Sequence, residues 1–216
     1  MAHPPLPPDP APSALHPTAR TLLDTWFGDG LRLGWPSAPR RDLWFNSTRA
    51  LDDALRADFG AAVEAALAGG LTDWSATPAG RLARVLLLDQ LPRNLFRRTA
   101  RAFAGDAAAQ AETRAALAAG DDRRLPPVGR VFLLMPLMHA EDLGLQALGV
   151  QAFEALATEA PPPAPPDALA DHARFARLHH DIVARFGRFP HRNAVLGRPD
   201  TPAEADFLRD GPRFGQ

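Results

Sequence analysis

Apolar residues recur along this chain at intervals of three and four positions, the spacing that places side chains on one face of a helix. The clearest example lies between residues 48 and 69. Its apolar positions at this spacing are Leu51, Leu55, Phe59, Val63 and Leu67. No alternating run of β-branched residues is long enough to predict a strand. The pattern therefore predicts an all-α fold.

Capping residues and prolines indicate where the helices begin and end. Thr77-Pro78 is typical of a helix N-terminus, with a capping threonine before a proline. Thr201, Pro202 and Glu204 add a capping box to the same signal. The predicted helices cover residues 18–27, 48–68, 77–91, 99–119, 127–137, 142–159, 167–186 and 201–210, and residues 28–45 are expected to form a loop. About eight helices with mostly short connections favour antiparallel pairs stacked into a compact array.

The length of 216 residues suits one domain. We expect a disordered proline-rich tail at residues 1–17, a single helical domain at 18–210 and a short tail at 211–216. The proline-rich run at residues 160–166 is interpreted as a stiff connector inside the domain, because too little chain follows it for a second one. No signal peptide or membrane span is recognisable, so we expect a cytoplasmic location without membrane contact.

Three residue types are missing from the sequence: cysteine, lysine and tyrosine. Without cysteine there is no disulfide, no thiolate metal site and no cysteine nucleophile. Without lysine there is no Schiff base and no phosphate-loop lysine. The formal charge of −1 argues against nucleic acid as a partner, because nucleic-acid binding usually needs a basic surplus.

All 24 basic residues are consequently arginines. A genome rich in arginine, alanine and proline codons is one explanation. The other is functional, since arginine forms fixed, bidentate contacts with carboxylates and phosphates. The sequence contains no G-x-S-x-G, H-E-x-x-H or Walker A motif. The choice between the two explanations therefore depends on where individual polar residues lie.

The first informative cluster is Asp89, Arg93, Asn94 and, more weakly, Arg98. Asp89 falls on the apolar face of its predicted helix, where a carboxylate must find a partner or change its pKa. Arg93, four residues later, is the obvious partner, and Pro92 is expected to bend or end the helix between them. The cluster is interpreted either as part of a site or as a lock at a helix end.

The second cluster is His139, Glu141, Asp142 and Gln146. On a continuing helix His139, Asp142 and Gln146 share a face. A histidine near a carboxylate can act as a general base or as one edge of a metal site. The alternative is a capping cluster, because acidic residues are favoured at a helix N-terminus.

Two further groups lie toward the C-terminus. His179 follows an apolar stripe and is expected to point inward, as a core residue or a ligand-binding one. The loop after that helix brings Arg188, His191, Arg192 and Asn193 into six positions. We interpret this loop as an anion-binding site on a rigid scaffold, with a network that satisfies backbone carbonyls as the alternative.

Ordered motifs in the chain resemble the bacterial family catalogued as domain of unknown function 924, from about residue 22 to about residue 207. The motifs are Leu88-Asp89-Gln90-x-Pro92-Arg93-Asn94, Arg98-x-x-x-Ala102-Phe103-x-x-Asp106, Pro136-x-x-His139-x-Glu141 and the whole of residues 186–201. The resemblance implies an all-α, tetratricopeptide-like helical array and brings no established activity. Ala140 stands where the family usually has a serine.

Two functional hypotheses follow. In the first, the chain binds a small anionic molecule, a carboxylate or phosphate, in a polar pocket between helices, with acid/base chemistry by histidine. The candidate catalytic residues are Asp89, His139, Glu141 and His191, and the candidate ligand-binding residues are Arg93, Asn94, Arg98, Gln146, His179, Arg188, Arg192 and Asn193.

The first hypothesis has a subsidiary version with a His/carboxylate centre for Zn, Mn or Fe, although no metal ligand is assigned and no cofactor is named. In the second hypothesis the chain is a tetratricopeptide-like module that binds a peptide or protein, and the motif residues are structural locks. Whether the chain is an enzyme, and its oligomeric state, stay open.

Overall fold

The structure is a computed structural model that describes residues 15–160 and 163–212. This part of the chain contains helices and no strand, which confirms the all-α prediction. The longer helices are α1 (Pro17–Phe27), α4 (Arg49–Leu67), α5 (Pro78–Val85), α7 (Asp106–Ala119), α8 (Pro127–Met138), α9 (Leu143–Glu159), α10 (Pro166–Phe186) and α11 (Pro202–Asp210). None of the described helices is long and apolar enough to cross a membrane.

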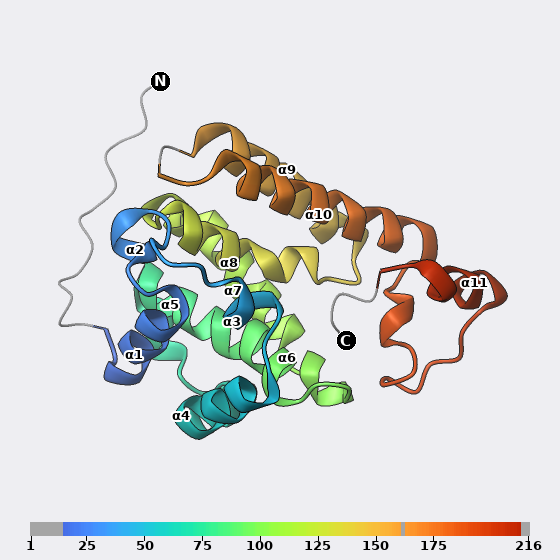
Figure 1. Ribbon diagram of the computed structural model, residues 1–216, viewed down its shortest axis with the longest axis horizontal. Coiled ribbons are helices and arrows are strands. Elements are labelled where there is room, and N and C mark those ends of the chain that lie inside the picture. The colour runs from blue at the N-terminus through green and yellow to red at the C-terminus, as the bar shows by residue number, and fades with distance from the viewer. Residues whose placement is uncertain (1–14, 161–162, 213–216) are drawn as a thin grey trace.

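Helix α8 forms the centre of the molecule. All of its residues except Arg130 are buried. The antiparallel pair α9 and α10 packs on one side of it, and α5 and α7 lie on the other (Figure 1). The hydrophobic face of α4 predicted from its spacing is buried at Leu55, Phe59 and Val63, and Thr48 caps the helix as expected.

Short elements join the long helices. They are α2 (Gly30–Leu33), α3 (Arg41–Phe45), η2 (Thr72–Ala76), η3 (Leu86–Gln90), α6 (Leu91–Leu95), η4 (Ala100–Phe103), η5 (Asp121–Arg124) and η6 (Pro190–Arg192). The element η3 is a single π-helical turn, in which the Leu91 N–H bonds the Leu86 carbonyl, and the others labelled η are 3₁₀ turns. π turns inside α-helices are frequent at functional sites.

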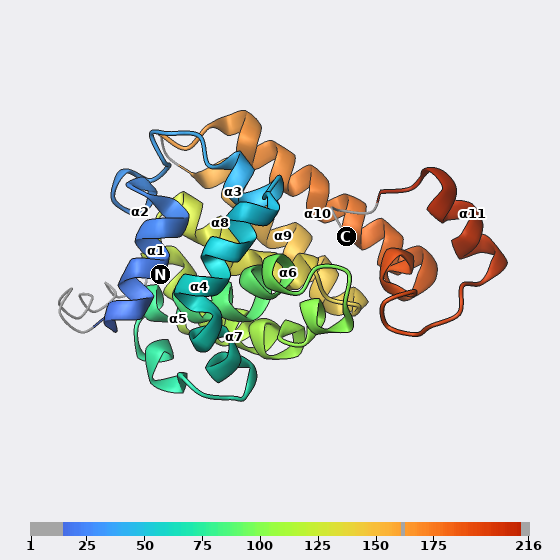
Figure 2. The ribbon, with the colours of Figure 1, turned by 60° about the horizontal axis from the view of Figure 1, so that its bottom comes forward.

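Helix α11 and the loop before it extend past the end of α10 (Figures 1 and 2). A small separate apolar cluster of Ile182, Val183 and Phe189 anchors this C-terminal segment, with Phe186 and Phe207 against it. The predicted capping box of Thr201 and Glu204 is present at the start of α11.

Two expectations about local structure were wrong, and a third was narrowed. The loop expected at residues 28–45 contains α2 and α3, which are too short for periodicity to reveal. The helix expected over residues 99–119 is divided into η4 and α7 around Gly105, where a Cβ would lie 2.2 Å from the Leu88 carbonyl oxygen. Of the two outcomes expected for Pro92, an end or a bend, the helix does not end there, because the π turn η3 just before it leads directly into α6.

The ends of the chain and the proline connector are only partly described. Residues 1–14, 161–162 and 213–216 of the predicted tails and connector lie outside the described residues. The expected tail is too long at its inner end, because Pro17 already begins α1 and the His16 ring caps that helix.

Candidate functional site

A pocket of about 740 Å³ opens between the segment before α4, the middle of the fold and the first half of α10. Its size is within the range of small-molecule sites. Its lining consists of Trp35, Pro36, Ser37, Ala38, Pro39, Arg40, Arg41, Trp44, Phe45, Asn46, Gln90, Arg93, Asn94, Arg97, Met135, Met138, His139, Pro165, Ala168, Asp171, His172, Phe175 and His179. The lining therefore contains four of the residues predicted as candidates, Arg93, Asn94, His139 and His179, and a fifth, Asp89, contacts His139 from outside the lining.

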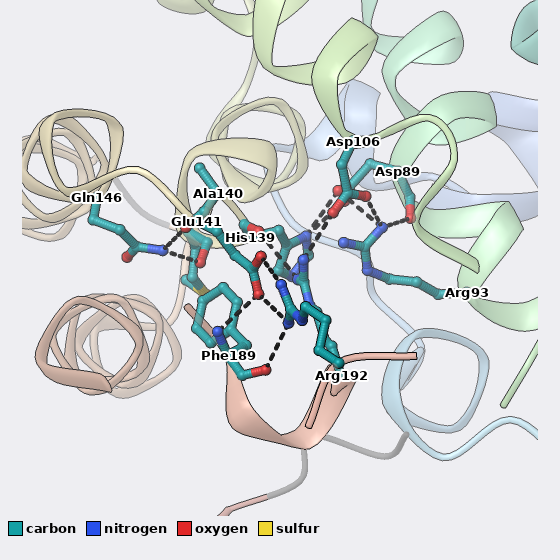
Figure 3. A network of polar contacts seen from close by, with 11 residues as sticks. Asp89, Arg93, Asp106, His139, Ala140, Glu141, Gln146, Phe189 and Arg192 are labelled. Carbon is teal, nitrogen blue, oxygen red and sulfur yellow. Dashed lines mark hydrogen bonds and ion pairs between the residues drawn. The ribbon is translucent and has the colours of Figure 1, made fainter. Parts of the chain in front are cut away.

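Asp89 and His139 form a pair beside this pocket. The Nδ1 atom of His139 lies 2.8 Å from Oδ1 and 3.0 Å from Oδ2 of the fully buried Asp89 (Figure 3). Asp89 comes from the π turn η3, and His139 follows the last residue of α8. Gln90 donates a further hydrogen bond to Asp89 Oδ2 over 2.6 Å.

The charges of this pair follow from its surroundings. Burial alone would raise the pKa of Asp89, but Arg93 and His139 together hold it well below its usual value. Burial lowers the pKa of His139, and this effect outweighs the opposing attraction of Asp89. At neutral pH Asp89 is therefore an anion and His139 a neutral imidazole that donates Nδ1–H to it.

Arg93 and Arg192 meet at a shared carboxylate. Asp106 lies 2.9 Å from Arg93 Nη1 through one oxygen and 3.0 Å from Arg192 Nη1 through the other (Figure 3). Arg93 Nη1 also lies 3.2 Å from Asp89 Oδ1, so the partnership predicted from the sequence is confirmed. Arg93 Nη2 is buried and has no hydrogen-bond acceptor among the described residues.

Arg192 holds the backbone of His139 in place. Its Nη2 donates to the His139 carbonyl over 3.1 Å, and its guanidinium lies between the rings of Phe103 and Phe189, 4.5 and 4.6 Å from their centroids. Burial lowers the pKa of Arg192 to about 10, against the raising effect of Asp106, so the side chain stays a cation at neutral pH.

The turn that carries His139 differs from the predicted arrangement. The helix ends at Met138 and α9 begins at Leu143, so His139 and Gln146 do not share a helix face. Instead, Gln146 Nε2 donates to the Met138 and Ala140 carbonyls, each over 2.7 Å, while Asp142 caps α9. Asp142 therefore has the capping role that was the alternative interpretation, and Gln146 stabilises the turn that carries His139 through the backbone carbonyls on both sides of it.

Asn94 connects the pocket to α4. Its Nδ2 donates to Asp52 Oδ1 over 3.0 Å, and Arg97 binds the same carboxylate at 2.7 Å. Burial alone would raise the pKa of Asp52, but the hydrogen bonds from Arg97 and Ser47 lower it. These contacts place the guanidinium of Arg97 on the pocket lining.

Two further arginines bring positive charge to the pocket. Arg40 donates from Nη1 to the Thr25 carbonyl over 3.1 Å, and its Nε has no hydrogen-bond acceptor among the described residues. Within residues 15–160 and 163–212, neither Arg40 nor Arg41 forms an ion pair with a carboxylate. The one carboxylate of the lining, Asp171, pairs with Arg174 at 3.1 Å.

The C-terminal loop forms its own network outside the pocket lining. Glu141 accepts two hydrogen bonds from Arg198, at 2.6 and 2.9 Å, and one from the Phe189 N–H at 2.8 Å. Although burial opposes it, these bonds lower the pKa of Glu141. Arg188 pairs with Glu204 at 2.6 Å, and Asn193 donates to Asp200.

The remaining candidates lie at different depths. His179 is buried, as expected, and its Nδ1 lies 2.8 Å from the Phe175 carbonyl; burial lowers its pKa to about 3. His191 is outside the pocket lining, and burial lowers its pKa to about 3 as well. Arg98 is exposed, with a φ of 59° and no ion pair in the described part of the chain.

Several residues of the site were not predicted. Asp106 appears in the family motif but was given no role, although it binds both Arg93 and Arg192. Arg40, Arg41 and the aromatic residues near them were missed because their segment has no helical periodicity. As for the subsidiary metal hypothesis, the described residues contain no group of three or more His, Asp or Glu side chains placed to hold a metal ion.

Comparison with known proteins gives the family of this chain. The model of a bacterial protein family of unknown function, DUF924, matches residues 22–212. The chain belongs to this family. A solved structure of a protein of unknown function from Agrobacterium tumefaciens, ATU0120, shares 34% sequence identity and a TM-score of 0.75, covering 89% of this chain and 97% of that one. A search of curated proteins finds no match.

Proposed function

We propose that this DUF924 protein binds a small anionic ligand, a carboxylate or a phosphate, in the pocket and that His139 exchanges a proton with it. The observation that carries the proposal is that His139 lines a positively charged pocket and is paired with the buried Asp89 behind it. A buried carboxylate with a neutral histidine is costly to fold, and such strongly perturbed groups gather at functional sites.

The binding half of the proposal rests on the arginines. Arg40 and Arg41 contribute charge that no carboxylate of the described residues neutralises, and Arg93 Nη2, which has no acceptor in that part of the chain, would gain one from an anion. Guanidinium groups bind carboxylates and phosphates in a planar, bidentate way that an ammonium group does not reproduce.

The proton-transfer half rests on the two nitrogens of His139. Nδ1 carries its hydrogen toward Asp89, so Nε2 is the nitrogen with the basic lone pair. When Nε2 takes a proton from water or from the ligand, Asp89 stabilises the imidazolium that forms. The one hydroxyl side chain of the described lining, Ser37, donates to Asp29 Oδ2 over 2.6 Å, which favours water over a serine nucleophile.

The alternative hypothesis, a tetratricopeptide-like module that binds a peptide, makes a different use of the same residues. The pairs Arg188–Glu204 and Arg198–Glu141 support a structural role for the C-terminal loop. Arg93 and Arg97 have such ion pairs as well, but Arg40 and Arg41 have none among the described residues, so we favour the small ligand.

Calorimetric titration with inorganic phosphate and with acetate tests anion binding. The wild type should bind at least one of them, and Arg41→Gln should weaken that binding about tenfold, as expected for the loss of one charge-assisted contact. Arg41 is exposed, so folding is not at stake. The matched control is Arg114→Gln, also exposed and remote from the pocket lining, which should bind like the wild type. Equal binding by both variants would contradict the proposal.

A further inference from the structure

The pocket has an aromatic wall that anion binding does not require. The rings that line it, apart from His139 and His179, are Trp35, Trp44, Phe45, His172 and Phe175. They come from the segment leading to α4 and from α10. The His172 ring lies 6.2 Å from that of Phe45 and stacks on Phe153 at 6.1 Å, so the two segments meet through aromatic contacts.

Two of these rings are left in contact with solvent. Phe45 is 46% exposed and Phe175 37% exposed. Both of the exposed phenylalanines of the described chain therefore line the same pocket. Apolar surface gathered in one hollow with a polar rim indicates a binding site, whereas single exposed apolar residues need no explanation.

A positive charge and an aromatic ring lie on the same face of α3. Arg41 and Phe45 are four residues apart on α3, a spacing that brings two side chains to the same side of a helix. A ligand that contacts this face meets a guanidinium and a phenyl ring at once.

We propose that the ligand of this pocket carries a flat aromatic ring beside its carboxylate or phosphate group. The inference rests on the proposed function and adds the class of ligand. A ring would pack on the exposed surface of Phe45 and on the part of Phe175 that Arg174, 4.6 Å from its centroid, leaves open. The anion would contact the arginines, and 740 Å³ is large enough for such a molecule. The dimensions fit a small molecule better than a folded partner.

Matched pairs of ligands test the ring. Phenyl phosphate is compared with cyclohexyl phosphate, and benzoate with cyclohexanecarboxylate, by calorimetry on the full chain. Within at least one pair the aromatic member should bind about three- to tenfold more tightly, because ring stacking adds to the burial of apolar area. The pair that shows the effect identifies the anion as phosphate or carboxylate.

Two variants test whether the preference for the aromatic ligand arises at Phe45 and Phe175. Phe45→Leu and Phe175→Leu keep the apolar bulk but lose the flat face, so each should bring the affinity ratio within a pair closer to one. Leu148→Ala is the control, because Leu148 is also 37% exposed but lies outside the pocket lining, and it should keep the wild-type ratio.

Equal affinities within both pairs would overturn the inference and leave the proposed anion binding intact. Failure of all four ligands and of inorganic phosphate to bind would overturn both. Tighter binding of tetraglutamate than of either aromatic acid would indicate a peptide partner and would also overturn the inference.

Discussion

Asp106 and Arg192 are 86 residues apart in the chain, and their side chains meet at 3.0 Å beside the site. Asp106 begins α7, and Arg192 lies in the loop after α10. Because the same carboxylate binds Arg93 and the same arginine binds the His139 carbonyl, the contact connects the C-terminal loop to the pocket residues. Arg192 was predicted to bind an anion; in the structure it orients His139 through the backbone carbonyl of that residue.

Arg192→Lys tests this connection. An ammonium group cannot contact Asp106 and the His139 carbonyl together while stacking between two rings. We expect a loss of about 2–4 kcal/mol in the free energy of unfolding, measured by urea denaturation. Arg114→Lys, at an exposed position, should stay within about 0.5 kcal/mol of the wild type. A wild-type stability for Arg192→Lys would show that the contact is dispensable.

Asp89→Asn should destabilise the fold by about 3 kcal/mol. It removes one of the two carboxylates that pair with Arg93, and it places an amide, which carries N–H donors of its own, against the donors of Gln90 and His139. It should also change the tautomer of His139, because an amide no longer favours a hydrogen on Nδ1. Urea denaturation measures the first effect, and nitrogen-15 chemical shifts of the histidine rings measure the second. The comparison variant is Asp171→Asn, an exposed carboxylate on the same pocket, for which little change in stability is expected.

Stability should fall as the pH is lowered from about 6.5 toward about 4. Burial lowers the pKa of His172 to about 4 and those of His179 and His191 to about 3, so the unfolded chain binds protons in this range that the folded chain excludes. The contribution of these histidines is fully present above the unfolded pKa and decreases below it. Asp52 and Glu141, whose pKa values are also lowered, add a further loss below about pH 4.

Urea denaturation at a series of pH values measures this dependence. His172→Phe keeps a ring against Phe153 and removes one of the groups, so the decrease between about pH 6.5 and about pH 4 should become shallower. An unchanged slope in this variant would show that His172 takes up its proton equally in the folded and unfolded states.

Gly105→Ala should cost about 1–3 kcal/mol, because the new Cβ would lie 2.2 Å from the Leu88 carbonyl oxygen and force the π turn or the start of α7 to move. Gly60→Ala is the matched control in α4, where the Cβ meets only the Arg56 side chain at 3.7 Å. There the substitution should be neutral or stabilising, because alanine favours helix. If both variants had the same stability, the close packing of Gly105 on Leu88 would be refuted.

The sequence predicts the parts of this structure that depend on local patterns. Thr48, Thr77 and Thr201 cap their helices as expected, and Asp89 is buried beside Arg93 because both lie within two turns of one segment. From the sequence either Asp89 or Glu141 could position the histidine, and the choice was not predictable, since Asp89 is 50 residues from His139 and meets it only when α8 packs against η3.

The pocket could not be predicted from local sequence patterns either. Arg41, Trp44 and Phe45 belong to a helix of five residues, which is too short for an apolar period. Arg188 and Asn193 looked like site residues from composition alone, but their partners Glu204 and Asp200 follow them within the same loop and helix. Whether they have a role in binding stays a prediction.

The most direct test follows the histidine ring signals by NMR while phenyl phosphate and, in a parallel experiment, benzoate are titrated into the full chain. His139 and His172 line the pocket, whereas His180 does not. If the pocket binds an aromatic anion next to the Asp89–His139 pair, the signals of His139 and His172 should shift with a common, saturable dependence on ligand, and the His180 signal should stay in place. Unmoved His139 and His172 signals with both ligands, or equal shifts of all three histidines, would contradict the proposed function.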